Sequence, residues 1–254
     1  MRLDHKIALV TGASQGIGRA IATRFARAGA AVVINHLAHQ TDAEKVLGEI
    51  QAAGGQGLII QADVTRNADI RRMFDTAAAH FGQLDILVNN AGIEIEAAFP
   101  DITETDFDAV MNVNFRGAFF CAQAFVRHLR ATSRPGRIIN ISSIHEDLPY
   151  PGHTAYCASK GALKMLTRNL AVELGPAGIC INNIAPGAIE TPINAALLAD
   201  QTRTALLRAQ IPLGRLGSTS DVAALAVFIA SDEAAYITGA TFYVDGGLAV
   251  HYEE

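Results

Sequence analysis

A tyrosine and a lysine four residues apart have the types and the spacing that suit proton transfer. Tyr156 and Lys160 lie in the stretch "HTAYCASKGALK", residues 153–164. Side chains four positions apart share one face of a helix. An ammonium group beside a phenol favours the phenolate and lowers the phenol pKa from about 10, so the pair can exchange a proton near neutral pH. The same spacing also arises by chance, so its context decides its meaning.

Ser143 offers a third polar group to this pair. It lies thirteen residues before Tyr156 in "INISSIHED", directly after a strand-like run. A hydroxyl at a strand end can hold the oxygen of an alcohol or carbonyl while the phenol exchanges the proton. The three residues predict a proton-transfer site if the fold brings them together.

The turn after the first apolar run is rich in glycine. In "VTGASQGIG", Gly12, Gly16 and Gly18 are spaced G-x-x-x-G-x-G. Glycine permits a tight turn and a close backbone approach to phosphate, and a helix beginning there offers free N–H groups and its positive dipole end. The spacing differs from the common G-x-G-x-x-G fingerprint. Its place between a strand and a helix therefore carries the prediction of nucleotide binding.

The end of the second expected strand bears on the choice between NAD and NADP. In many dinucleotide folds an Asp or Glu here, about twenty residues past the glycines, binds the ribose 2′-hydroxyl. This chain has His36 and Leu37, and no Arg or Lys stands there or at Gln15 to hold a 2′-phosphate. The absence of a cation favours NAD over NADP without settling the choice. The alternative is that His36 is only a solvated strand end.

Two further turns follow expected strands at their carboxyl ends, where ligands bind in open α/β sheets. Asp63 in "QADV" can accept from an adenine amino group or can instead cap the next helix. "NNAG", Asn89 to Gly92, closes the following strand. Its two asparagines can also brace backbone turns.

Seven short apolar runs are the expected strands: residues 6–12, 30–35, 57–63, 84–92, 136–143, 180–187 and 240–247. Several are apolar almost throughout, which is typical of strands covered on both faces of a parallel sheet. Amphipathic segments such as 19–30, 42–55 and 68–82 separate them, and the last two end at glycine, a helix stop signal. The alternation predicts a doubly wound, Rossmann-like α/β fold with a parallel seven-stranded sheet. We expect a single domain over residues 1–254, with a substrate loop at about 186–219.

Composition argues against several classes of function. Half of the residues are hydrophobic and 18% are charged, which predicts a sizeable core. The net charge is −5 without a block of Lys and Arg, which argues against nucleic-acid binding. Three scattered cysteines form no C-x-x-C or Cys/His set, so we expect no metal site. Without a membrane-length apolar run or a secretory signal pattern, we expect a cytoplasmic protein that does not contact membranes.

Seven elements run through the chain in a fixed order: "TGASQGIG", "NNAG", "NVNF", Ser143, "YCASK", "NNIAPGAIETP" and "VDGG". In order and spacing they resemble the classical short-chain dehydrogenase/reductases over essentially the whole length. The resemblance implies reversible hydride transfer between a nicotinamide and an alcohol/carbonyl pair. It makes Tyr156 the catalytic acid/base, Lys160 the group that lowers its pKa and binds the nicotinamide ribose, and Ser143 the anchor of the reacting oxygen. It also implies that Asn114, the second Asn of "NVN", helps hold a proton-relay water.

The same resemblance places Pro186, Gly187, Ile189 and Thr191 against the nicotinamide, with Thr191 near its carboxamide or phosphates. The residues implied to bind NAD or NADP are Gly12, Ser14, Gln15, Gly16, Ile17, Gly18, His36, Leu37, Asp63, Val64, Asn90, Ala91, Gly92, Tyr156, Lys160, Pro186, Gly187, Ile189 and Thr191.

A narrower resemblance, to the glucose 1-dehydrogenase branch, bears on the substrate. It rests on "SIHEDLPYP" after the fifth strand, Glu94 in "NAGIE", and "GAIETPIN" after the sixth strand. A sugar or polyol needs several hydrogen-bond partners, which Glu94, Ser143, His145 and Asn194 can supply from strand-end loops. The alternative is that His145 and Glu146 only shape their loop and that Glu94 is solvated.

The resemblance leaves rival functions open. The 3-oxoacyl-(acyl-carrier-protein) reductases share the scaffold but favour basic surface patches, and this chain has no obvious cluster of that kind. A non-catalytic dinucleotide-sensing regulator can keep the fold, yet Tyr156, Lys160, Ser143 and Asn114 are all retained, which favours an enzyme. The glucose 1-dehydrogenase branch tends to carry a basic residue where Leu37 stands, so its tolerance of NADP need not extend here. Because family members usually form homotetramers, we expect a homotetramer that acts on a small molecule.

Overall fold

The computed structural model describes residues 2–251, and a parallel sheet runs through its centre. Within these residues the sheet has seven strands in the order β3-β2-β1-β4-β5-β6-β7. The strands are β1 (Ile7–Val10), β2 (Ala31–His36), β3 (Gly57–Gln61), β4 (Ile86–Asn89), β5 (Gly136–Ile141), β6 (Ile179–Pro186) and β7 (Thr241–Val244). Each strand matches one of the seven expected apolar runs, with β2 ending one residue later and β6 beginning one residue earlier than expected, so the predicted fold is confirmed.

The order of the strands reverses beside β1, which pairs with β2 on one side and with β4 on the other. β1 and β4 are buried along their whole length, as their unbroken apolar sequences predict. In open α/β sheets such a reversal leaves a crevice at the carboxyl ends of the strands. The turns after these strands therefore face a common space.

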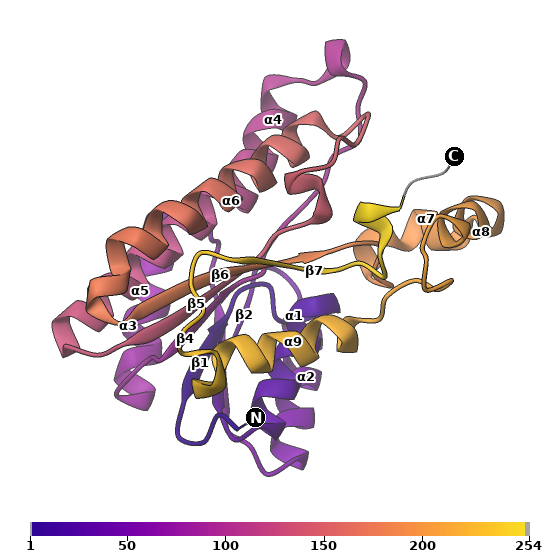
Figure 1. Ribbon diagram of the computed structural model, residues 1–254. Helices are drawn as coiled ribbons and strands as arrows, with labels where there is room; N and C mark the ends of the chain where they lie inside the picture. The colour runs from indigo at the N-terminus through magenta and orange to yellow at the C-terminus, as the bar shows by residue number, and fades with distance from the viewer. Residues whose placement is uncertain (1, 252–254) are drawn as a thin grey trace.

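Helices cover both faces of the sheet (Figure 1). One hydrophobic core lies under α1 (Gly16–Arg27), α2 (Gln40–Ala52) and α9 (Thr219–Ala230). The other lies under α3 (Asn67–Phe81), α5 (Ala118–Thr132) and α6 (Thr154–Leu174). The molecule is thus a three-layer sandwich, as a doubly wound fold requires.

Local sequence explains where these helices begin and end. On α1 the buried residues Gly18, Ile21, Ala22 and Phe25 recur at three- and four-residue intervals, which turns one stripe towards the sheet. α3 ends at Gly82, whose φ of 78° is the left-handed conformation that stops a helix. The predicted glycine stop is confirmed there.

Shorter elements complete the chain. They are α4 (Glu104–Met111), a π-helical segment (Asn112–Gly117), α7 (Ala195–Ala199), α8 (Gln201–Ala209) and the 3₁₀ turns Phe99–Asp101, Ile144–Glu146, Gly175–Ala177, Pro192–Asn194, Asp232–Ala234 and Leu248–Val250. α7 and α8 occupy the long segment after β6 and lie at one end of the sheet, outside its two helical layers (Figure 1). This is the segment that the sequence predicts to be a substrate loop.

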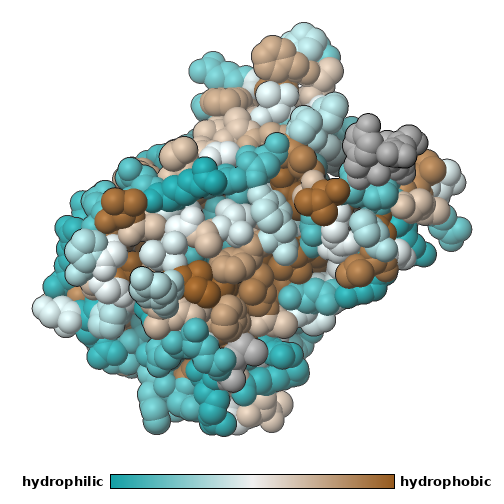
Figure 2. All heavy atoms as spheres, in the orientation of Figure 1, coloured by the Kyte–Doolittle hydropathy of each residue, from teal (hydrophilic) through white to brown (hydrophobic). Residues whose placement is uncertain are grey.

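The face that carries β7 and α9 mixes two kinds of surface. Figure 2 shows hydrophobic side chains gathered between α9 and β7, with hydrophilic side chains around them. Among residues 2–251, no helix has the length and apolar character needed to cross a membrane.

Candidate active site

A cleft of about 810 Å³ opens at the carboxyl ends of the strands. It is lined by the turns after β1 to β6 and by the segment that carries α7 and α8. Every residue proposed from the sequence to bind cofactor or substrate lines this cleft except Gly18, and of the proposed catalytic residues only Asn114 stays outside. One space therefore collects groups from six separate turns.

The glycine turn forms one end of the cleft and meets the start of α1. Gly16 has a φ of +55°, which favours glycine. At Gly18 a Cβ atom would lie 2.4 Å from Asn90 Nδ2, so this glycine lets α1 approach the turn after β4. No side chain caps α1 at Gln15 and its first turn has no acidic residue, so its N–H groups and dipole suit an anion such as a phosphate. The turn fits a dinucleotide.

Two asparagines hold the glycine turn in place. Asn35 Oδ1 accepts from Gly12 N at 3.2 Å, while its Nδ2 donates to Ala62 O at 3.0 Å. Asn90 Nδ2 donates to Thr11 O at 2.8 Å and to Gly12 O at 3.0 Å. Asn90 therefore braces the turn while it lines the cleft. Asn35 was missed from the sequence, where its one signal was an amide inside the apolar run of β2.

His36 lies at the end of β2 and is only 1% exposed, so the interpretation of a solvated strand end is wrong. Both its ring nitrogens are buried and make no hydrogen bond of normal length and angle, although the Gln40 side chain lies close enough to oppose the effect of burial on the His36 pKa. Burial lowers the pKa of His36, which favours the neutral imidazole. Leu37, by contrast, is 59% exposed at the rim. An unpartnered imidazole in the wall of a cleft suits a hydroxyl group of a ligand.

Asp63 and Asn89 both make contacts within the protein, as the alternatives to ligand binding require. Asp63 lines the cleft, but its Oδ1 also accepts from the backbone N and the hydroxyl of Thr65, both at 2.8 Å. Asp63 thus braces the turn before α3. Asn89 Nδ2 donates to Asn140 Oδ1 at 2.9 Å between β4 and β5, and Asn89 does not line the cleft.

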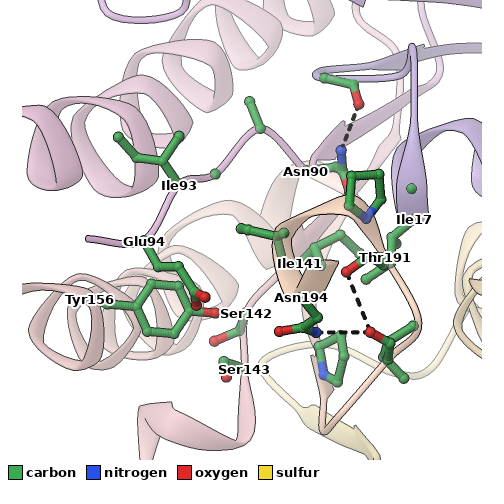
Figure 3. A pocket seen from close by; sticks show the side chains of 18 of the residues that line it. Ile17, Asn90, Ile93, Glu94, Ile141, Ser142, Ser143, Tyr156, Thr191 and Asn194 are labelled. Atoms are coloured by element: carbon green, nitrogen blue, oxygen red, sulfur yellow. Dashed lines mark hydrogen bonds between the residues drawn. The ribbon is translucent and has the colours of Figure 1, made fainter. Parts of the chain in front are cut away.

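The structure brings Tyr156, Lys160 and Ser143 together at the middle of the cleft. Tyr156 and Lys160 project from α6, and Ser143 follows β5. Figure 3 shows the side chains of Tyr156 and Glu94 directed towards Ser142 and Ser143. Lys160 Nζ donates to Ile141 O at 2.9 Å and lies 5.5 Å from the centre of the Tyr156 ring. The predicted convergence of the three residues is present.

The electrostatics of this centre differ from the simple expectation. Burial lowers the pKa of Lys160 to about 8, and the nearby carboxylates of Glu146 and Glu94 oppose that shift. Burial raises the pKa of Tyr156, and its hydrogen bond with Ser143 opposes that rise. We expected Lys160 to lower the pKa of Tyr156, but burial is the largest influence on this pKa and raises it. The physical reason is that the ammonium lies over the ring and bonds to the Ile141 carbonyl.

Asn114 sits in the π-helical segment and is 2% exposed. Its Oδ1 accepts from Ile93 N at 2.8 Å, and its Nδ2 donates to Ile93 O at 2.9 Å and to Ser159 Oγ at 3.1 Å. The amide thus bonds to the loop after β4 through both of its ends and to α6 through Nδ2 alone. The structure gives Asn114 this bracing contact, and its part in a proton relay stays a prediction.

Glu94, His145 and Asn194, the other residues proposed to bind substrate, also line the cleft. Burial raises the pKa of Glu94, and His153 opposes the rise, so Glu94 is not simply solvated. The rings of His145, Tyr150 and His153 form a stack, with centroid separations of 4.4 and 3.9 Å. Asn194 Nδ2 donates to the backbone carbonyl of residue 189 at 2.8 Å (Figure 3), which leaves its Oδ1 without a bond among the described contacts.

Hydrophobic side chains surround these polar groups. The lining here includes Ile93, Leu148, Pro149, Ile193, Leu197, Leu207 and Leu248. Those of α7 and α8 were missed from the sequence because nothing in a loop pattern shows which side chains turn inwards. In the described part of the chain, no group of three or more His, Cys, Asp or Glu side chains is arranged to hold a metal ion.

One cleft joins a glycine turn at a helix start to a buried Tyr–Lys pair and a strand-end serine, an arrangement that suits a dinucleotide-dependent oxidoreductase. A family model described as enoyl-(acyl carrier protein) reductase matches residues 12–249. The chain is 42% identical to 3beta-hydroxysteroid dehydrogenase 1 of Eggerthella lenta over 249 residues, 98% of this chain and 95% of that protein. It is 39% identical to glucose 1-dehydrogenase 2 of Bacillus subtilis over 250 residues, 98% and 96% of the two chains.

Solved structures agree with these sequence relatives. A gluconate 5-dehydrogenase from Burkholderia cenocepacia, in complex with NADP and tartrate, superimposes with a TM-score of 0.94 at 38% identity, over 99% of this chain and 98% of that one. The chain belongs to the classical short-chain dehydrogenase/reductase family. It is an NAD(P)-dependent enzyme, which confirms the predicted family and favours the enzyme over the non-catalytic sensor.

Proposed function

We propose that the protein interconverts a secondary alcohol and its ketone, with Tyr156 as the acid/base. The observation that carries the proposal is the meeting of Tyr156, Lys160 and Ser143 in a cleft that continues to the glycine turn. Bound NAD(P) supplies the hydride acceptor for oxidation and the donor for reduction. Gly16 and the first turn of α1 would hold its phosphates, and His36 would face its ribose.

Each catalytic side chain then has a distinct task. In oxidation Ser143 holds the substrate hydroxyl, and Tyr156 takes its proton as the carbon gives up hydride. Lys160, as an ammonium, favours the phenolate form that can accept this proton. In reduction the same phenol returns a proton to the carbonyl oxygen. Burial raises the pKa of Tyr156, which disfavours the phenolate near neutral pH, so the nearby ammonium is needed to stabilise the phenolate.

Replacement of Tyr156 by Phe tests the acid/base assignment. The ring and its packing remain while the exchangeable proton is lost, so turnover should fall by at least about a hundredfold. Binding of NADH, followed by its fluorescence, should stay close to wild type. The control is Tyr243→Phe, whose hydroxyl bonds to Asp147 outside the cleft and whose loss should leave turnover intact. Substantial turnover by Tyr156→Phe would remove Tyr156 from the mechanism.

For the substrate we propose a sugar or polyol, because Glu94, His145 and Asn194 surround the reacting centre with polar atoms from three loops. The glucose 1-dehydrogenase relative supports this choice. Glu94→Gln should then raise the KM for a polyol severalfold, since a carboxylate accepts hydrogen bonds that an amide accepts less well. The KM for a simple apolar ketone should change little. Equal changes for both substrates would take Glu94 out of the substrate site.

The hydrophobic lining supports a second candidate substrate. Leu148, Ile193, Leu197 and Leu207 suit an extended apolar body attached to one carbinol, such as a hydroxysteroid or a carrier-bound 3-oxoacyl chain. The hydroxysteroid dehydrogenase relative is compatible with it. A panel of sugars, polyols, hydroxysteroids and 3-oxoacyl thioesters, read by NAD(P)H absorbance, separates the candidates.

We further propose that NAD is preferred over NADP, since His36 is buried and its lowered pKa favours a neutral ring. The segment at about 186–219 would act as the substrate loop, because α7 and α8 contribute side chains to the cleft. A homotetramer and a cytoplasmic location stay predictions from the sequence.

A further inference from the structure

Glu146 is a buried carboxylate that the proposed reaction has not used. Its side chain is 0% exposed. Oε2 accepts from Ser142 Oγ at 2.5 Å and from Asn183 Nδ2 at 3.1 Å. Oε1 accepts from Thr241 Oγ1 at 2.7 Å and lies 3.4 Å from Lys164 Nζ. With donors at both oxygens, the pocket is complementary to a carboxylate anion.

These contacts fix the end of β5. The bonded Ser142 lies between Ile141, whose carbonyl accepts from Lys160 Nζ, and Ser143, which holds the substrate oxygen in the proposed reaction. The other donors belong to β6, β7 and α6. Glu146 thus ties two strands and a helix to the short segment at the end of β5 that serves both Lys160 and the substrate.

The charge of Glu146 also acts on the catalytic lysine. Lys160 is buried, and the carboxylates whose charge raises its pKa are Glu146, on the turn after β5, and Glu94, in the loop after β4. Its own helix adds Tyr156 and, one turn later, Lys164, which pairs with Glu146 and Asp147. Of the two carboxylates, Glu146 exerts the larger effect and has no place among the residues that line the cleft.

We propose that Glu146 is a positioning residue for hydride transfer, which clamps the Ile141–Ser143 segment and keeps Lys160 in its cationic form. The proposal rests on the proposed function, in which Lys160 must be an ammonium to favour the Tyr156 phenolate. It also gives the Glu of "SIHEDLPYP" a role other than contact with the substrate.

The charge of Lys160 can be measured directly in Glu146→Gln. The chain has only four lysines, so trace acetylation at a series of pH values, with tandem mass spectrometry, reports the neutral fraction of each. Removal of the carboxylate should lower the pKa of Lys160 below its value of about 8, which raises the neutral fraction of this lysine at pH 7 severalfold. Near-wild-type circular dichroism would establish that the variant is folded. This readout needs neither cofactor nor turnover.

The matched control is Thr241→Val, which removes one hydrogen bond to the same carboxylate and keeps its charge. It should destabilise the fold as a structural role predicts, while the labelling profile of Lys160 stays as in wild type. The pH profile of kcat for alcohol oxidation gives a second readout. In Glu146→Gln its high-pH limb, where kcat decreases, should move to lower pH, because Lys160 then loses its proton at a lower pH. Thr241→Val should leave that limb in place.

An unchanged Lys160 profile in folded Glu146→Gln, or an equal shift in Thr241→Val, would overturn the electrostatic role. If Glu146→Gln fails to fold, Glu146→Asp keeps the charge but shortens the clamp. It should retain the Lys160 profile and lose kcat, and an unchanged kcat would overturn the clamp. Failure of the proposed function would instead show as wild-type protein that forms no NAD(P)H with any alcohol.

Discussion

At the scale of single residues, burial sets the behaviour of the reactive groups more than their nearest neighbours in sequence do. The Tyr156–Lys160 spacing alone predicts a phenol whose pKa is lowered by a cation. In the structure desolvation acts on both groups and shifts each pKa towards the neutral form. Carboxylates from other loops, Glu146 and Glu94, oppose the shift on the lysine. The charge states of the proposed catalytic pair therefore depend on residues ten or more positions away in the sequence.

His36 is the residue-scale test of cofactor choice. An aspartate at the end of β2 would place a negative charge beside any 2′-phosphate, so His36→Asp should weaken NADPH binding about tenfold or more relative to NADH. Fluorescence titration of both reduced cofactors measures the ratio of the two Kd values. His39→Asp adds the same charge at an exposed position of the cleft and should change the ratio less. A ratio unchanged in His36→Asp would show that residue 36 does not contact the ribose.

At the scale of elements, the capping of a helix start decides whether its backbone N–H groups are free to bind a ligand. α1 begins without a capping side chain, which leaves its N–H groups for a ligand. α9 begins with a complete capping box, in which Ser218 Oγ accepts from Asp221 N and the Asp221 carboxylate accepts from Ser218 N. The contrast fits the proposed function, because the start of α1 lines the cleft and the start of α9 does not.

The α9 cap gives a stability prediction at this scale. Ser218→Ala should lower the free energy of unfolding by about 1 kcal/mol, measured by urea denaturation at pH 7. Hydrogen bonds from Arg215 and Ser218 hold the pKa of Asp221 well below its usual range. A lowered carboxyl pKa contributes stability above the unfolded pKa of about 4, and that contribution is lost as the pH falls below it.

The effect of Ser218→Ala should therefore shrink in acid. Ser220→Ala, two residues further along, serves as the control: its exposed hydroxyl lies 2.7 Å from Ser218 Oγ but caps no backbone N–H, so its loss should lower stability less than Ser218→Ala does. A loss of similar size in Ser220→Ala would mean that the cap does not stabilise the helix start.

At the scale of the whole molecule, the sequence determined the elements and their order. Strands that are apolar throughout must be covered on both faces, and their alternation with amphipathic helices permits a parallel sheet with turns gathered at one edge. For that reason the sequence predicts that the glycine turn, "NNAG", Ser143 and Tyr156 share one site. Local chemistry and chain order suffice for such assignments.

Tertiary structure alone decided what lies next to what across the fold. It buried His36, used both ends of the Asn114 amide, turned leucines of α7 and α8 into the cleft, and joined Glu146 to donors from β6 and β7. These contacts link residues far apart in the chain, and no periodicity or spacing encodes them. Desolvation and hydrogen-bond satisfaction depend on that packing, so the sequence determined the class of reaction while the fold decided the charge states and the shape of the site.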